Sequence, residues 1–182
     1  MTGDRNKVGG EANIVTGDDN LAYGKENSLS GNKNAAIGDY NVGAGDNNVA
    51  VGDHNEFFGE GNRIKGKKNS VMGDFNIAYG HENDIAGDKN HVRSVGSKIT
   101  GNGNVIIGNN NNVNGNGNRL RGHGNCVGGH SNCIAGHHNK VDGDKNDVNG
   151  SKNKVTGRNN SVEGDNNLVR QVSFAQLPII FD

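Results

Sequence analysis

Residues 136–156 read GHHNKVD-GDKNDVN-GSKNKVT, three heptads that carry glycine, asparagine and valine at matching positions. The same spacing extends outward in both directions, so that a residue of this glycine column recurs every seven positions from Gly3 to Gly164. If that column is called position a, the chain contains 24 consecutive heptads without an insertion, and 23 of them begin with Gly. Position d is Asn in 23 heptads, and position f is apolar in 23. Three columns kept in register over this length indicate an internal repeat architecture.

The heptad predicts a short strand followed by a turn. A coiled coil is excluded, because glycine costs a helix about 1 kcal/mol at each occurrence and only one apolar column is present. Positions d to g alternate, so Asn at d and the apolar residue at f face inward while e and g face outward. Gly at a supplies a positive φ or a tight corner, and the polar residues at b and c complete the turn.

Two heptads placed back to back form one 14-residue coil with a thin core. About 12 such coils, stacked at roughly 4.8 Å, give a rod about 57 Å long. We therefore expect an all-β fold, a single parallel β-solenoid over residues 1–170. Residues 171–182 break the repeat, and we expect them to form a C-terminal cap or neck-like segment.

Buried asparagine is tolerable in such a rod if each side-chain amide bonds those of the coils above and below. Stability is then a sum over neighbouring coils. Ser94–Ser97 is the one weak heptad, where we expect local irregularity. The predicted structural ladder includes Asn20, Asn34, Asn48, Asn62, Asn76, Asn104 and Asn118.

Composition excludes several classes of function. The chain has 19 Lys+Arg against 20 Asp+Glu, so its overall charge gives no reason to expect nucleic-acid binding. No apolar run is long enough for membrane insertion, and no signal peptide is visible. No carboxylate pair or Ser-His-Asp set stands out from the repeat, so we expect no enzyme, no catalytic residue and no cofactor.

A few side chains outside the glycine, asparagine and apolar columns are candidate sites. His123 and His137 are one coil apart at position b and are expected to stack, with Cys126 in the same heptad as His123. A surface zinc or pH-sensitive site is conceivable there, but exposed turn residues explain the pattern better, and no metal site is predicted. Cys126 and Cys133 lie in successive heptads and should point outward from opposite faces, which excludes an intrachain disulfide.

The repeat resembles two known families. The segments Asn20-Leu-Ala-Tyr-Gly24, Asn48-Val-Ala-Val-Gly52 and Asn76-Ile-Ala-Tyr-Gly80 resemble the head domains of YadA-like trimeric autotransporter adhesins, as does Asn34-Ala-Ala-Ile-Gly38. The tail Val169-Arg-Gln-Val-Ser-Phe-Ala175 is similar to the neck of that family. This resemblance implies a left-handed β-roll, a homotrimer, a host-surface or matrix ligand, and an extracellular or cell-surface location.

The second resemblance is to the grass ice-recrystallisation-inhibition proteins, whose repeat is x-x-Asn-x-Val-x-Gly. Asn104-Val-Ile-Ile-Gly108, Asn146-Asp-Val-Asn-Gly150 and Asn153-Lys-Val-Thr-Gly157 follow that pattern. This resemblance implies a monomeric β-roll with ice-related activity.

The outward e and g residues are expected to decide the function. One face carries apolar pairs, interrupted by Arg63/Lys65 and His91/Arg93, and becomes polar beyond Ile107. The other face is mixed, and charged residues on both faces interrupt the regular small rows that are typical of ice binding. The candidate interface or ligand face is Leu21, Tyr23, Ile37, Val49, Val51, Ile77, Tyr79, Val105 and Ile107.

The first interpretation is therefore an adhesive, receptor-binding or structural rod that packs as a trimer through the apolar face. The alternative is a monomeric ice-binding protein or a pure structural spacer.

Overall fold

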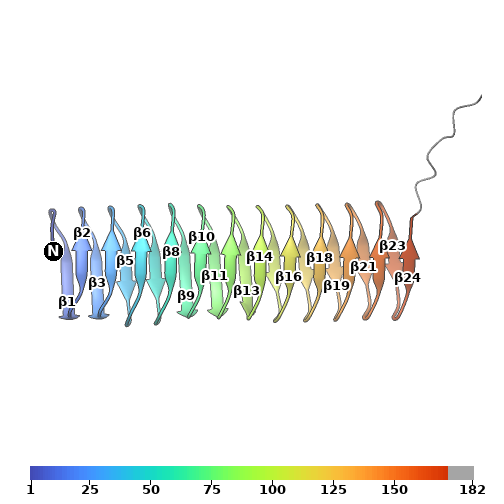
Figure 1. The fold of residues 1–182 in the computed structure, drawn as a ribbon, viewed down its shortest axis with the longest axis horizontal. Helices are drawn as coiled ribbons and strands as arrows, with labels where there is room; N and C mark the ends of the chain where they lie inside the picture. Colours follow the sequence, from blue (N-terminus) through green and yellow to red (C-terminus); the bar gives the residue numbers. More distant parts are fainter. Residues whose placement is uncertain (172–182) are drawn as a thin grey trace, which may run out of the picture.

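The computed structural model describes residues 1–171, and in this part of the chain it is a straight rod of 24 strands without a helix (Figure 1). The strands alternate along the chain between two parallel 12-stranded sheets. Sheet A contains the even-numbered strands and sheet B the odd-numbered ones. The predicted all-β parallel solenoid of about 12 coils is confirmed. The segment predicted to act as a cap lies, apart from Gln171, outside the described residues.

The strands are short, with three or five residues each, and each contains positions e, f and g of one heptad. Sheet A consists of β2 (Ile14–Thr16), β4 (Ser28–Ser30), β6 (Val42–Ala44), β8 (Glu56–Phe58), β10 (Ser70–Met72), β12 (Asp84–Ala86), β14 (Lys98–Thr100), β16 (Asn112–Asn114), β18 (Cys126–Gly128), β20 (Lys140–Asp142), β22 (Lys154–Thr156) and β24 (Leu168–Arg170). Sheet B consists of β1 (Lys7–Glu11), β3 (Leu21–Lys25), β5 (Ala35–Ile37), β7 (Val49–Val51), β9 (Arg63–Lys67), β11 (Ile77–His81), β13 (His91–Val95), β15 (Val105–Ile107), β17 (Arg119–Arg121), β19 (Cys133–Ala135), β21 (Asp147–Asn149) and β23 (Ser161–Glu163).

The register between neighbouring strands never shifts. Every residue pairs with the residue 14 positions away, as Ile37 pairs with Val51 and Ser30 with Ala44. The side chains at one heptad position therefore form a straight row along the rod, with a spacing of about 4.8 Å. This constant register turns each outer sheet surface into two parallel rows, one of e residues and one of g residues.

The core is a single layer of f residues from the two sheets. These residues are buried from Val15 to Val162, and most are Val, Ile or Ala. Phe57 is the largest of them, and its register partner in the preceding coil is Gly43. A Cβ atom at position 43 would lie 2.0 Å from the Phe57 ring, so the ring occupies the space that the glycine leaves.

Two backbone positions are left-handed in 23 of the 24 heptads. All 23 glycines at a have positive φ, as predicted. All 24 residues at c also have φ between about 52° and 68°, and 19 of them are not glycine. We predicted only a polar turn at c, because the varied residue types there do not indicate a positive φ.

The asparagines at d form the predicted ladder. Asn76 donates its backbone N–H and its Nδ2 to Oδ1 of Asn62, at 2.9 and 3.1 Å. Its Nδ2 also donates to the carbonyl oxygen of Gly87 at 2.7 Å, and its Oδ1 accepts two bonds from Asn90. Among the described residues no buried side-chain nitrogen or oxygen lacks a partner. The ladder thus explains how a polar column can lie inside a core this thin.

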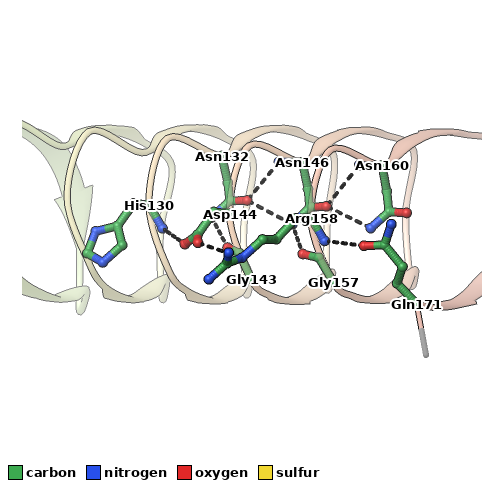
Figure 2. A network of polar contacts seen from close by, with 9 residues as sticks. All are labelled: His130, Asn132, Gly143, Asp144, Asn146, Gly157, Arg158, Asn160 and Gln171. Atoms are coloured by element: carbon green, nitrogen blue, oxygen red, sulfur yellow. Dashed lines mark hydrogen bonds and ion pairs between the residues drawn. The ribbon is translucent and has the colours of Figure 1, made fainter. Parts of the chain in front are cut away.

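Position b forms a second ladder along the corners of the rod. Where the b residue of the next coil is Asp, Asn, His or Ser, its side chain accepts the backbone N–H of the b residue before it, as Asp144 Oδ1 accepts that of His130 at 2.9 Å. Arg158 continues this line by donating its N–H to Oε1 of Gln171, while its side chain pairs with Asp144 at 3.2 Å. Figure 2 shows this corner ladder beside the Asn132–Asn146–Asn160 ladder.

The weak heptad does not break the rod. Strand β13 runs through Ser94 and keeps its register with β11, and Gly80 pairs with Ser94. The Ser94 carbonyl still accepts the Nδ2 of Asn83, and its hydroxyl donates to Asn83 Oδ1. The expected irregularity therefore has two local forms. The Ser94 hydroxyl adds a hydrogen bond to Asn83, and Ser94 lacks the positive φ that glycine adopts at position a in the other heptads.

Candidate functional site

The predicted apolar residues share the outer surface of sheet B. They come from β3, β5, β7, β11 and β15, and their side chains point away from the core. Tyr23, Ile37 and Ile107 are the most open, at 51%, 45% and 49% exposure. The predicted face therefore exists as a surface, but β9 and β13 lie within it and contribute Arg63, Lys65, His91 and Arg93.

Sheet B is also hollowed at regular intervals. A shallow depression of about 340 Å³ lies beside Arg63 and Lys65, and another of about 330 Å³ lies beside Arg93. A third, of about 480 Å³, lies beside Arg121. These basic residues belong to β9, β13 and β17, so successive depressions are two coils apart. Alternation of long and short side chains on a flat sheet produces this relief.

Sheet A differs from sheet B in the charge of its outer rows. Its g row carries no charged residue in nine consecutive strands, from β2 to β18. In the first three of these strands the e row is uncharged as well, with Ile14, Ser28 and Val42. From the sequence we predicted a mixed face, because the e and g residues taken together include charged residues. The g row of these strands is Thr16, Ser30, Ala44, Phe58, Met72, Ala86, Thr100, Asn114 and Gly128.

The expected trimer interface gains no support from this arrangement. Packing three copies through sheet B would bring Arg63, Lys65 and Arg93 of each copy toward those of the others. Burying like charges without partners is costly. The homotrimer stays a prediction.

His123 and His137 stack on each other at one corner of the rod, as predicted. Their rings stack with centroids 5.2 Å apart and planes 7° apart. His137 Nδ1 accepts the backbone N–H of His123 at 3.1 Å, and His123 Nδ1 accepts that of Asn109 at 2.7 Å. Both rings must keep Nδ1 free of a proton for these bonds, so they serve the corner ladder. Among residues 1–171 no group of three or more potential metal ligands is assembled.

The two cysteines lie as predicted. Cys126 is on β18 in sheet A and Cys133 on β19 in sheet B, and both are free and exposed. They point away from each other across the core, so they do not pair within the chain.

One pair of shifted pKa values belongs to the corner ladder. The Lys67 ammonium bonds Asp53 at 2.8 Å and, together with the backbone N–H of Asp39, holds the pKa of the Asp53 carboxyl below its usual range. The same pair raises the pKa of Lys67. The pair is a contact between two successive coils at an exposed edge of the rod.

Comparison with known proteins gives one decisive result. The family model described as "Grass antifreeze beta roll" matches residues 1–96 and again residues 85–172. The chain belongs to the grass antifreeze β-roll family. The second resemblance seen in the sequence is thereby confirmed, whereas the adhesin-head resemblance gains no support from the match.

Other comparisons add little. A solved structure described as the polysialic-acid-specific acetyltransferase NeuO covers 96% of this chain and 89% of its own chain. Its identity is 12% and its TM-score 0.16, so no inference rests on it. No curated protein matches the sequence. In the described part of this antifreeze β-roll, no helix is long and apolar enough to cross a membrane.

Proposed function

We propose that this β-roll binds ice through sheet A and inhibits ice recrystallisation. The observation that carries the proposal is the g row of β2 to β18, which is uncharged over nine strands of a chain from the antifreeze β-roll family. An extracellular location fits such a role, because ice forms first outside cells.

The geometry of sheet A suits a crystalline partner. Its rows repeat at about 4.8 Å along the rod, and the e and g rows are about 6.6 Å apart. The ladders fix the coils in one register, so the side chains already have this spacing before ice binds. Binding therefore does not carry the free-energy cost of ordering them. Small groups such as those of Thr16, Ser28, Ser30 and Ala44 can hold water between them in a regular array.

Strands β2, β4 and β6 form the best part of this face. Both of their rows are uncharged, so no hydrated ammonium or carboxylate stands between the surface and the ice. From β8 onward Glu56 interrupts the e row, and only the g row continues.

A pair of matched variants tests which face acts. Ser30→Lys with Ala44→Lys places two charges on sheet A, and Ile37→Lys with Val51→Lys places two on sheet B at the same heptad position of the same coils. We expect the sheet A variant to lose inhibition of ice-grain growth in annealed frozen sucrose solution, and the sheet B variant to retain it. Loss in the sheet B variant alone would move the ice face to the apolar residues of sheet B.

A further inference from the structure

Sheet B carries a pattern that ice binding does not explain. Between β7 and β17 its outward pairs alternate strictly between apolar and basic, and no carboxylate occurs at e or g from β3 to β19. The successive pairs are Val49/Val51, Arg63/Lys65, Ile77/Tyr79, His91/Arg93, Val105/Ile107 and Arg119/Arg121.

The basic residues of this band are exposed and unneutralised. The six ion pairs formed within residues 1–171 involve basic residues of the corners and of sheet A. Arg63, Lys65, Arg93, Arg119 and Arg121 take part in none of them. A chain of formal charge −1 thus concentrates five uncompensated positive charges on one face, which attracts a polyanion despite the overall balance.

The spacing of the basic pairs along the rod does not fit a nucleic acid. Basic pairs recur every two coils, about 9.6 Å apart. Duplex DNA carries one charge per about 1.7 Å of axis, far more densely than this band. Single-stranded nucleic acid is bound through aromatic side chains on which bases stack, and the band offers only Tyr79 between its basic pairs.

The relief between the charges fits sugar rings. The depressions on this face are lined by Val49, Val51, Tyr79 and Ile107 beside the basic side chains. Apolar and aromatic surfaces of this kind accept the C–H faces of pyranose rings. Two linked pyranoses in an extended chain span close to the length of two coils, so one charged and one neutral sugar would match each repeat of the band.

From charge, spacing and relief together, we propose that β7 to β17 of sheet B bind a linear acidic polysaccharide with one carboxylate per two-sugar repeat, lying along the rod. Arg63, Arg93 and Arg121, on alternate coils, pair with successive carboxylates, and Val, Ile and Tyr79 pack against the sugars between them. This proposal concerns the face opposite to the one proposed for ice, and it does not rest on ice binding.

The experiment measures the affinity of the full chain for hyaluronan oligosaccharides, whose repeat is one uronate and one neutral N-acetylated sugar. Neutral dextran, oligothymidylate and phosphatidylserine vesicles are the comparison ligands. We expect binding to hyaluronan that weakens as salt is added. Arg63→Glu with Arg93→Glu should lower the affinity about tenfold or more, because two attractive contacts become repulsive.

A matched control makes the same change of charge on the other face. Lys140→Glu with Lys154→Glu lies on sheet A and alters net charge equally, so its affinity should stay at that of the unmodified chain. Thermal melting confirms that each variant folds, and Arg63→Gln with Arg93→Gln replaces the acidic variant if that one does not. Absence of hyaluronan binding at low salt would overturn the proposal. So would equal loss in both variants, or tighter binding to oligothymidylate or vesicles.

Discussion

At the scale of the residue, the fold depends on two left-handed positions in each heptad that impose different demands. At a, an added Cβ would collide with the backbone of the next coil, so only glycine fits in the positive φ seen there. At c the side chain points into solvent, so many residue types are tolerated in spite of the strain. This difference explains why a is constant in the sequence and c is not.

Gly108 and Gly103 provide a direct test of that difference. A Cβ at Gly108 would lie 2.1 Å from the carbonyl oxygen of Gly122, whereas a Cβ at Gly103 would have no neighbour within 4 Å. Gly103→Ala should cost only the conformational strain, about 1–2 kcal/mol. Gly108→Ala should cost clearly more, about 4 kcal/mol or beyond, as measured by denaturant unfolding. Equal losses would show that the close approach between coils is not decisive.

Substitutions at Gly43 and Phe57 should have coupled effects on stability, because the two residues share one volume of the core. Phe57→Val leaves a void above Gly43, and Gly43→Val forces a methyl group into the Phe57 ring. Each single change should destabilise the chain by about 1–3 kcal/mol. The double change places valine at both positions, as at Val141 and Val155, so it should be more stable than the sum of the singles by about 1 kcal/mol or more. Additive losses would contradict the pairing.

At the scale of the element, each strand is too short to persist alone and is held by its two neighbours. The asparagine ladder joins the coils at d, and the corner ladder joins them at b. The sequence predicts the first ladder, because Asn is almost constant there and must be satisfied if it is buried. It does not reveal the second, because Asp, Asn, His and Ser all present an acceptor at b and no single residue type marks the column.

Removing one rung tests the first ladder. Asn76→Ala removes the donor to the Gly87 carbonyl and to Asn62, and it leaves Asn90 without its acceptor. Each buried group left unpaired costs about 1–3 kcal/mol, so the free energy of unfolding should fall by several kcal/mol. Asn167→Ala, in the last complete heptad, is the control and should cost much less, because Asn167 is only half-buried and, within residues 1–171, its Oδ1 accepts no bond from another asparagine. Similar losses at both sites would argue against the ladder as a stabilising element.

The ion pair between Asp53 and Lys67 in the corner ladder makes the stability of the fold depend on pH. Lys67 holds the pKa of Asp53 below its ordinary value, so this pair stabilises the fold above the unfolded-state pKa of Asp53 and loses that contribution as the pH falls through the folded-state pKa. Lys67→Met should raise the pKa of Asp53, measured by NMR titration of its carboxyl carbon. The backbone bond from Asp39 remains in that variant. An unchanged pKa would mean that the ion pair does not form in solution.

At the scale of the whole molecule, the rod presents two long faces with different chemistry. The sequence is enough to predict the solenoid, the length of a coil and which residues point outward. All three follow from the seven-residue period and its constant a, d and f positions. It does not identify the face that acts, since e and g residues are free of the constraints that fix a, d and f. The structure adds the register that aligns these residues into rows and the depressions beside the basic residues of sheet B.

The trimeric adhesin interpretation shows the same limit. It rests on apolar pairs such as Val49/Val51, and the Arg63 and Lys65 that interrupt them project from the same outer surface of sheet B. Local apolar motifs can be shared by families whose faces serve different partners. Family membership and surface charge together favour ice over self-association.

The most direct measurement is the growth of ice grains in a frozen sucrose solution containing the full chain, annealed just below its melting point and followed by microscopy. The account predicts that grains stay small at low protein concentration and that heat-unfolded protein at the same concentration has no such effect. Grains that coarsen at the same rate with folded chain, unfolded chain and buffer would contradict the central claim that this β-roll binds ice.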